Sequence, residues 1–301
     1  MPENSRRPDF FIVGAPKSGT TAMNDYLRQH PEIFMPERKD LSFFGADLQF
    51  SRPRITHRQY LALFSGAQDC RRLGETSVWY LYSRSAAQEI KAFAPQAQIL
   101  IMLRNPVDML YAQHSQFLYN CNEDLPGFAE ALEAEEDRKH GRRIPRRAHF
   151  VGGLFYRETA RYVEQVERYL DVFGSQQVHI LLFDDFKRDT AAAYQEVLAF
   201  LGVEDSFRPA FQVVNPNKGL RSRLVQELLV APPPVFTWVS QRVVPGPWRG
   251  RLLQRLRKLN MRRMDRPTLD LDLRRRLQAD FQPEVERLAR LIGRDLSQWT
   301  C

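Results

Sequence analysis

The chain has 301 residues, of which 43% are hydrophobic and 27% are charged. This length supports one sizeable core or at most two small domains. The sequence contains no run of about 18 apolar residues, so we expect no membrane-spanning helix. The three cysteines lack disulfide-framework or metal-ligand spacing, which favours free thiols in a reducing, cytoplasmic compartment.

The formal net charge of +8 comes from one stretch of the chain. Nine basic residues and one acidic residue lie between Arg242 and Arg266, so the remainder is close to neutral. The basicity is therefore a local feature and not a property of the whole surface.

The first predicted element is a buried strand at Phe10–Val13, a short apolar run rich in β-formers. The sequence GAPKSGTT (14–21) follows and leads into a helix that continues to Leu27. A strand, a glycine-rich turn and a helix N-terminus form an anion site, to which Lys17 adds a full charge, so we expect a phosphate ligand. The lysine precedes the second glycine, unlike the order in nucleotide hydrolases. The alternative is an ordinary turn with a surface lysine.

The later elements alternate between strands and helices. We predict a strand that ends near 73–77, strands at 98–103 and 178–183, and helices at 56–64, 85–93, 106–119, 154–173, 190–201 and 269–291. This alternation predicts a parallel sheet covered on both faces. Ligands bind at the carboxyl ends of such strands, so the glycine turn, Glu75 and Arg104 should share one edge.

Three further segments leave alternatives open. Arg104 ends a buried strand, where it should meet either a bound anion or an internal carboxylate such as Asp108. Lys218–Gly219 either closes over a second phosphate or forms a surface turn. Residues 121–147 are rich in charge, so we expect a solvated excursion there, with a substrate-side loop as the alternative.

Several motifs in the same order resemble the sulfotransferase family that uses 3′-phosphoadenosine 5′-phosphosulfate (PAPS). They are GAPKSGTT (14–21), KDLSFF (39–44), GETS (74–77), LRNPVD (103–108) and NKG (217–219). The resemblance is strongest to the carbohydrate and heparan-sulfate branch and to bacterial members, and it covers all but about 121–150 and 225–262. It implies an α/β, P-loop-like three-layer fold with a central parallel sheet, in a single domain (1–301) with a basic, Pro-rich helical insert at about 225–262.

The resemblance also implies roles for individual residues. Lys17 would stabilise the charge on the leaving oxygen, and Asp40 would be the general base. Glu75 is the second candidate base, or else it orients Lys17 or Lys39. The donor PAPS, and the product 3′,5′-bisphosphate (PAP), would be bound without a metal by Pro16, Lys17, Ser18, Gly19, Thr20, Thr21, Arg104, Ser115, Lys218, Gly219 and Arg221.

Two positions depart from the family pattern. Asp40 stands where related carbohydrate sulfotransferases usually have glutamate, so either the loop compensates for the shorter side chain or another group is the base. Ala112 stands where the family commonly has a serine that contacts the 3′-phosphate. Ser115 lies one turn further along the helix and could substitute, or Lys218 and Arg221 supply the contacts.

The expected function is sulfuryl transfer from PAPS to a hydroxyl or amine of a carbohydrate or glycolipid. The alternatives are an inactive nucleotide or polyanion binder of the same fold and a nucleotide-dependent phosphotransferase. The basic helix at 249–263 is either a solvated helix, a contact with an anionic membrane at its inner face, or a contact with an acidic polysaccharide. No nucleic-acid-binding module is visible, so no nucleic-acid partner is expected.

Overall fold

The computed structural model describes residues 6–67, 69–212, 218–220, 225, 260–263 and 267–300. Its centre is a sheet of five parallel strands in the order β2-β3-β1-β4-β5. The strands are β1 (Phe10–Gly14), β2 (Ile33–Phe34), β3 (Arg72–Thr76), β4 (Gln98–Leu103) and β5 (Val178–Leu182). The predicted α/β fold with a central parallel sheet is confirmed.

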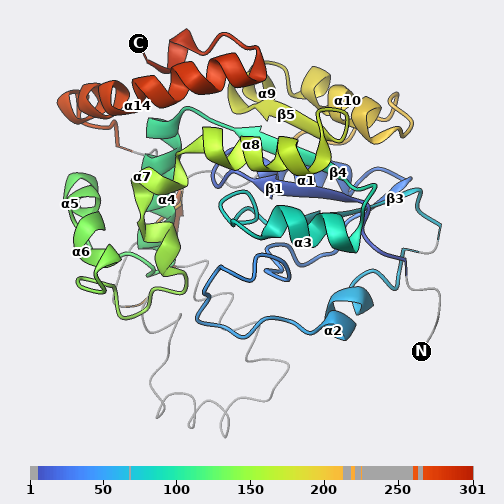
Figure 1. Cartoon of the computed structure of the whole chain (residues 1–301), viewed down its shortest axis with the longest axis horizontal. Helices are drawn as coiled ribbons and strands as arrows, with labels where there is room; N and C mark the ends of the chain where they lie inside the picture. Colours follow the sequence, from blue (N-terminus) through green and yellow to red (C-terminus); the bar gives the residue numbers. More distant parts are fainter. Residues whose placement is uncertain are drawn as a thin grey trace, which may run out of the picture.

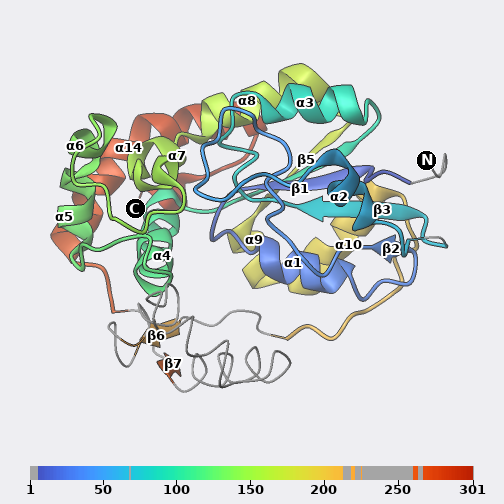
Figure 2. The same ribbon diagram turned by 90° about the horizontal axis from the view of Figure 1, so that it is seen from below.

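Helices cover both faces of the sheet (Figures 1 and 2). One face packs on α3 (Ala86–Phe93) and α8 (Tyr162–Phe173), and the other on α1 (Thr20–Leu27) and α10 (Thr190–Leu201). Successive residues of β1 alternate between the two cores: Phe11 faces α3 and α8, whereas Ile12 faces α1 and α10. Burial on both faces is why the strands are almost uniformly apolar and not alternating.

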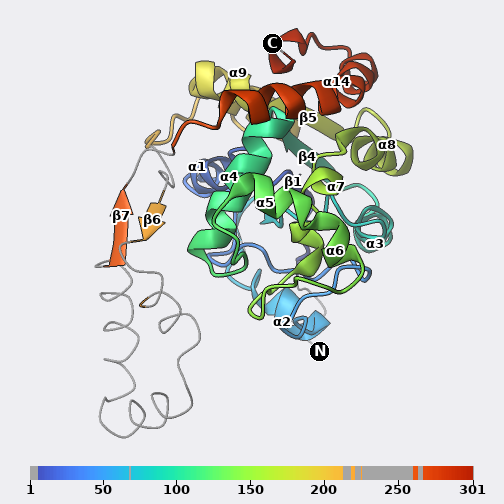
Figure 3. The same ribbon diagram turned by 90° about the vertical axis from the view of Figure 1, so that its left-hand side faces the viewer.

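The other helices lie around this three-layer core. They are α2 (His57–Ala62), α4 (Pro106–Tyr119), α5 (Phe128–Glu133), α6 (Glu135–Lys139), α7 (Tyr156–Thr159), α9 (Phe183–Arg188) and α14 (Leu271–Ile292), with 3-10 turns at Val151–Leu154 and Ser297–Trp299. In Figure 3, α4, α5 and α6 stand in front of the central sheet. The α4 helix begins at Pro106, where proline is favoured, and the Asn105 side chain accepts from the Val107 amide.

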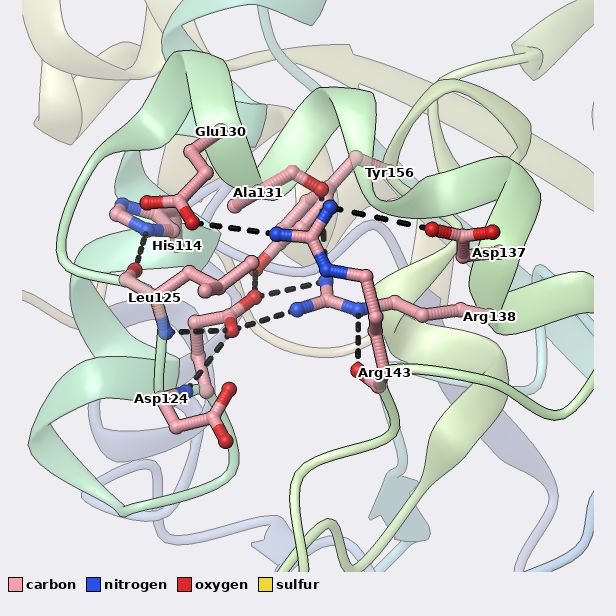
Figure 4. A network of polar contacts seen from close by, with 10 residues as sticks. His114, Asp124, Leu125, Glu130, Ala131, Asp137, Arg138, Arg143 and Tyr156 are labelled. Atoms are coloured by element: carbon pink, nitrogen blue, oxygen red, sulfur yellow. Dashed lines mark hydrogen bonds and ion pairs between the residues drawn. The ribbon is translucent and has the colours of Figure 1, made fainter.

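The expectation of a solvated excursion at 121–147 is wrong. Phe128, Ala131 and Leu132 are buried, and the side chains of Glu123 and Arg138 are fully buried in an ion pair of 2.7 Å. The Tyr156 hydroxyl also donates to Glu123 at 2.9 Å (Figure 4). Burial alone would raise the pKa of Glu123, but the hydrogen bonds from Arg138 and from the Leu125 amide outweigh it and lower that pKa. These groups join the excursion to the main core.

The single helix predicted at 154–173 is divided in two. The backbone leaves the helical region at Phe155 and again at Arg161, so α7 and α8 are separate. The Gln165 amide donates to the Glu158 and Thr159 carbonyls, which satisfies groups at the end of α7 that a continuous helix would have bonded internally.

Lys218 and Gly219, for which one expectation was a surface turn, lie in a strand. Lys218–Leu220 forms β6, which pairs antiparallel with β7 (Met261–Arg263) and lies against α4. Most of the predicted insert at 225–262 lies outside the described residues, as does most of the basic helix at 249–263. In the part of the chain that the structure describes, no helix is both long and apolar enough to cross a bilayer.

Candidate active site

The glycine turn connects the carboxyl end of β1 to the N-terminus of α1. Lys17 has a left-handed φ of +58°, and Gly19 caps α1 with a φ of +90°. A Cβ at Gly19 would lie 3.1 Å from the rings of Phe183 and Phe186, and other residues rarely adopt its φ, so glycine is strongly favoured there. The N-cap residue Gly19 has no side chain to bond the first-turn N–H groups of α1, which suits an anion site there. The phosphate ligand stays a prediction.

Other residues of the turn are held inside the fold. Pro16 and Ser18 are buried, and the Ser18 hydroxyl donates to the Pro16 carbonyl at 3.3 Å. Thr20 is buried and Thr21 is half-buried at the start of α1. The predicted donor-binding residues of this segment therefore lie in one largely buried turn beside the strand end.

Arg104 lies next to this turn, at the end of the neighbouring strand β4. Its guanidinium donates to the Lys17 carbonyl at 3.2 Å and lies over the Phe183 ring, 4.7 Å from the centroid. Burial lowers the pKa of Arg104, but a guanidinium stays protonated in proteins.

The alternative pairing of Arg104 with Asp108 is wrong. Asp108 pairs with Arg274 at 2.7 Å, and Arg104 makes no ion pair with any described residue. The charges of Asp108 and Asp184 favour the protonated form of Arg104, but neither forms an ion pair with it among the described residues, so the guanidinium is a suitable contact for a phosphate group.

The α4 helix supplies Lys17 with a neighbour, Gln116, that the sequence analysis did not identify. The Lys17 ammonium donates to the Gln116 side-chain oxygen at 3.1 Å. Gln116 follows the buried Ala112 by four residues, so the two share a helix face, and this spacing was the available signal. The Ser115 hydroxyl instead donates to the Tyr111 carbonyl of its own helix at 2.9 Å. A donor contact from Ser115 stays a prediction.

Asp40 lies in a loop beside the end of β3. Its amide donates to the Thr76 carbonyl at 2.7 Å, and its backbone is left-handed with a φ of +54°. Its carboxylate pairs with Lys39 at 2.7 Å and accepts from the Val78 amide at 3.3 Å. The side chain is 41% exposed, so the carboxylate is accessible to an acceptor.

Glu75 differs from Asp40 in being buried, with 1% of its surface exposed. Its carboxylate accepts from the hydroxyls of Tyr60, Ser77 and Tyr80. Burial, helped by the nearby charge of Asp40, raises the pKa of Glu75 to about 7 despite these hydrogen bonds. Among the described residues its partners are these three hydroxyls, so the expectation that it orients Lys17 or Lys39 is wrong.

The late donor-binding candidates are only partly described. Lys218 and Gly219 lie in β6, against the helix that carries Gln116, and Arg221 lies outside the described residues. Contacts of these three residues with a donor stay predictions.

The glycine turn, Arg104 and Glu75 therefore share the carboxyl edge of neighbouring strands, as predicted. A family model described as "Sulfotransferase domain" matches residues 7–215, which include all of these groups. The chain belongs to the sulfotransferase family. A crystal structure of a sulfotransferase from Alicyclobacillus acidocaldarius matches it with a TM-score of 0.74 and 33% identity, over 98% of this chain and 100% of that one.

Two curated relatives act on carbohydrates according to their names. Bifunctional heparan sulfate N-deacetylase/N-sulfotransferase 3 from Homo sapiens is 26% identical in an alignment of 230 residues, which covers 74% of this chain and 25% of that protein. Carbohydrate sulfotransferase 15 from Rattus norvegicus is 24% identical in an alignment of 305 residues, gaps included. This alignment covers 82% of this chain and 53% of that protein. The chain thus spans between a quarter and about half of the length of these relatives.

Proposed function

We propose that this sulfotransferase transfers a sulfuryl group from PAPS to a hydroxyl or amine of a carbohydrate. The observation that carries the proposal is the meeting of the α1 N-terminus, Lys17 and Arg104 at adjoining strand ends. Open backbone N–H groups and two side-chain cations suit the phosphate and sulfate groups of the donor without a metal ion. The names of the curated relatives support a carbohydrate acceptor.

In this mechanism, each group of the chain has a defined role. Asp40 accepts the proton of the acceptor hydroxyl or amine while that atom forms a bond to sulfur. The bond between sulfur and the donor's phosphate oxygen breaks, and the electron pair leaves on that oxygen. Lys17 stabilises the charge that grows there, and the turn and Arg104 hold the phosphates in line.

The test is transfer of labelled sulfate from PAPS to matched pairs of glycans. Each pair contains the N-acetylated and the de-N-acetylated form of one polysaccharide, so amine and hydroxyl acceptors are distinguished. We expect Lys17→Met to lower kcat by about 10²-fold or more, and the exposed Lys187→Met to serve as the matched control. Equal transfer by Lys17→Met and the wild type would contradict the role of Lys17.

A binding experiment tests the donor separately from the acceptor. We expect PAP to bind in the presence of EDTA and ATP with Mg²⁺ to bind more weakly. A preference for ATP would favour a phosphotransferase, and tight PAP binding without transfer to any glycan would favour an inactive binder. A cytoplasmic location and a membrane contact through 249–263 stay predictions.

A further inference from the structure

The carboxylate of Glu75 sets the direction of two neighbouring hydroxyl groups. The Ser77 hydroxyl donates to it at 2.8 Å and the Tyr80 hydroxyl at 2.7 Å. A hydroxyl has one hydrogen, so a hydroxyl that donates to Glu75 presents only lone pairs to its other neighbours. Both oxygens must therefore act as acceptors on their other side.

Those other neighbours are backbone amides of the loop that contains Asp40. The Leu41 amide donates to Ser77 Oγ at 3.0 Å. The Phe43 and Phe44 amides donate to the Tyr80 hydroxyl oxygen at 3.0 and 3.2 Å. Glu75 is thus linked, through the Ser77 or the Tyr80 hydroxyl oxygen, to three amides of the loop that follows Asp40, those of Leu41, Phe43 and Phe44.

The backbone of this loop needs such support. Ser42 has a φ of +53°, as unfavourable for a non-glycine residue as the φ of +54° at Asp40. Left-handed residues of this kind cost about 1–3 kcal/mol each and persist only where the surroundings determine them. The buried hydroxyls that Glu75 orients are part of those surroundings.

We propose that Glu75 is a positioning residue that holds the Asp40 loop in its reactive geometry through Ser77 and Tyr80. The proposal rests on the proposed function in so far as Asp40 is the base that the loop positions. Glu75 is unsuited to be that base itself, because its carboxylate is buried and accepts three hydroxyl groups. The raised pKa of Glu75 agrees with this burial.

Two buried tyrosines provide a matched pair of variants. Tyr60 and Tyr80 both donate to Glu75 and are both almost fully buried, but only the Tyr80 oxygen also accepts from the loop amides. Tyr80→Phe removes the link to the loop, and Tyr60→Phe removes a hydroxyl without touching that link. The Tyr60 ring stacks on Phe43 at 4.0 Å, and phenylalanine retains that ring.

The first readout is amide hydrogen exchange, which does not depend on activity. We expect Tyr80→Phe to accelerate exchange at Phe43 and Phe44 by about tenfold or more, and Ser77→Ala to do so at Leu41. Tyr60→Phe should change these rates by less than about threefold. Equal acceleration by both tyrosine variants, or none by Tyr80→Phe, would overturn the proposal. If the wild type transferred no sulfate, the proposed function would fail while this readout still tested the link.

The second readout compares the change in kcat with the change in the KM for PAPS. Tyr80→Phe should lower kcat by about 10- to 100-fold, because a misplaced catalytic group loses about that much, and should leave the KM for PAPS within about twofold. Glu75→Gln keeps an oxygen that accepts from Ser77 and Tyr80, so it should retain far more activity than Glu75→Leu. Loss of kcat in Glu75→Gln with unchanged loop exchange would identify Glu75 as the base and overturn the proposal.

Discussion

The Arg104 guanidinium donates to the Lys17 backbone carbonyl at 3.2 Å. The end of β4 thereby holds the turn that follows β1, in the left-handed conformation that Lys17 adopts there. Two cationic residues that follow adjacent strands are thereby brought together. A guanidinium beside the glycine turn is suited to binding a phosphate group.

Removing the charge of Arg104 should weaken donor binding. Arg104→Met keeps an apolar chain over Phe183 but deletes the guanidinium, so we expect the Kd of PAP to rise by about 10- to 100-fold, equivalent to about 1.4–3 kcal/mol. Calorimetric titration with PAP measures this change. Arg188→Met, at an exposed arginine, is the control, and equal affinities of the two variants would refute the assignment.

Replacing Asp40 should affect catalysis and not donor binding. Asp40→Asn keeps the size of the side chain and removes its basicity, so we expect kcat to fall by about 10²–10⁴-fold with an unchanged Kd for PAP. Asp40→Glu should retain more activity than Asp40→Asn, since it keeps a carboxylate. Steady-state kinetics with one acceptor distinguish these outcomes, and a fully active Asp40→Asn enzyme would mean that another group takes the proton.

The parts of the site that were predictable from the sequence are the local ones. The glycine turn follows a buried strand directly, and Arg104 ends another, so parallel pairing alone brings them to the same edge. The Glu75 network was not predictable, because Tyr60 and Tyr80 come from separate segments and each appears as an ordinary core aromatic. Gln116 was detectable only by its spacing of four residues from Ala112.

The excursion at 121–147 was misjudged for a related reason. Glu123 and Arg138 are 15 residues apart in the sequence, so nothing local indicates that they pair. Charged residues without a partner are normally exposed to solvent. Their burial depends on tertiary partners such as Tyr156, which composition does not reveal. Local periodicity was therefore sufficient to predict most helices and strands. The buried polar contacts between distant segments could be found only in the structure.

The raised pKa of Glu75 predicts how stability depends on pH. The folded protein holds this proton with a pKa of about 7, against the ordinary value of 4.5, so the folded state binds the proton more tightly than the unfolded state. Relative to Glu75→Gln, the wild type should lose up to about 3 kcal/mol of unfolding free energy as pH rises from about 4.5 to about 7. Urea unfolding of both proteins at pH 5 and pH 8 measures this. A difference that does not change with pH would show that Glu75 is not protonated near neutrality.

The buried pair of Glu123 and Arg138 predicts a large effect on stability. Arg138→Met leaves the Glu123 carboxylate buried without its cation, and we expect a loss of about 3–5 kcal/mol of unfolding free energy. Arg143→Met, which breaks an exposed pair with Glu130 at 3.2 Å, should cost less than about 1 kcal/mol. Denaturant unfolding at neutral pH compares the two variants.

The double variant Glu123→Gln/Arg138→Met distinguishes a buried charge from lost packing. The glutamine oxygen can accept from the Asp124 and Leu125 amides, which now donate to Glu123 Oε1, and its NH2 group can donate to the Tyr156 hydroxyl oxygen in place of Oε2. Glutamine carries no charge that needs a partner. We therefore expect the double variant to be more stable than Arg138→Met alone. If it were less stable than Arg138→Met, the main contribution of Arg138 would be its packing and its bonds to the backbone, and not the neutralisation of Glu123.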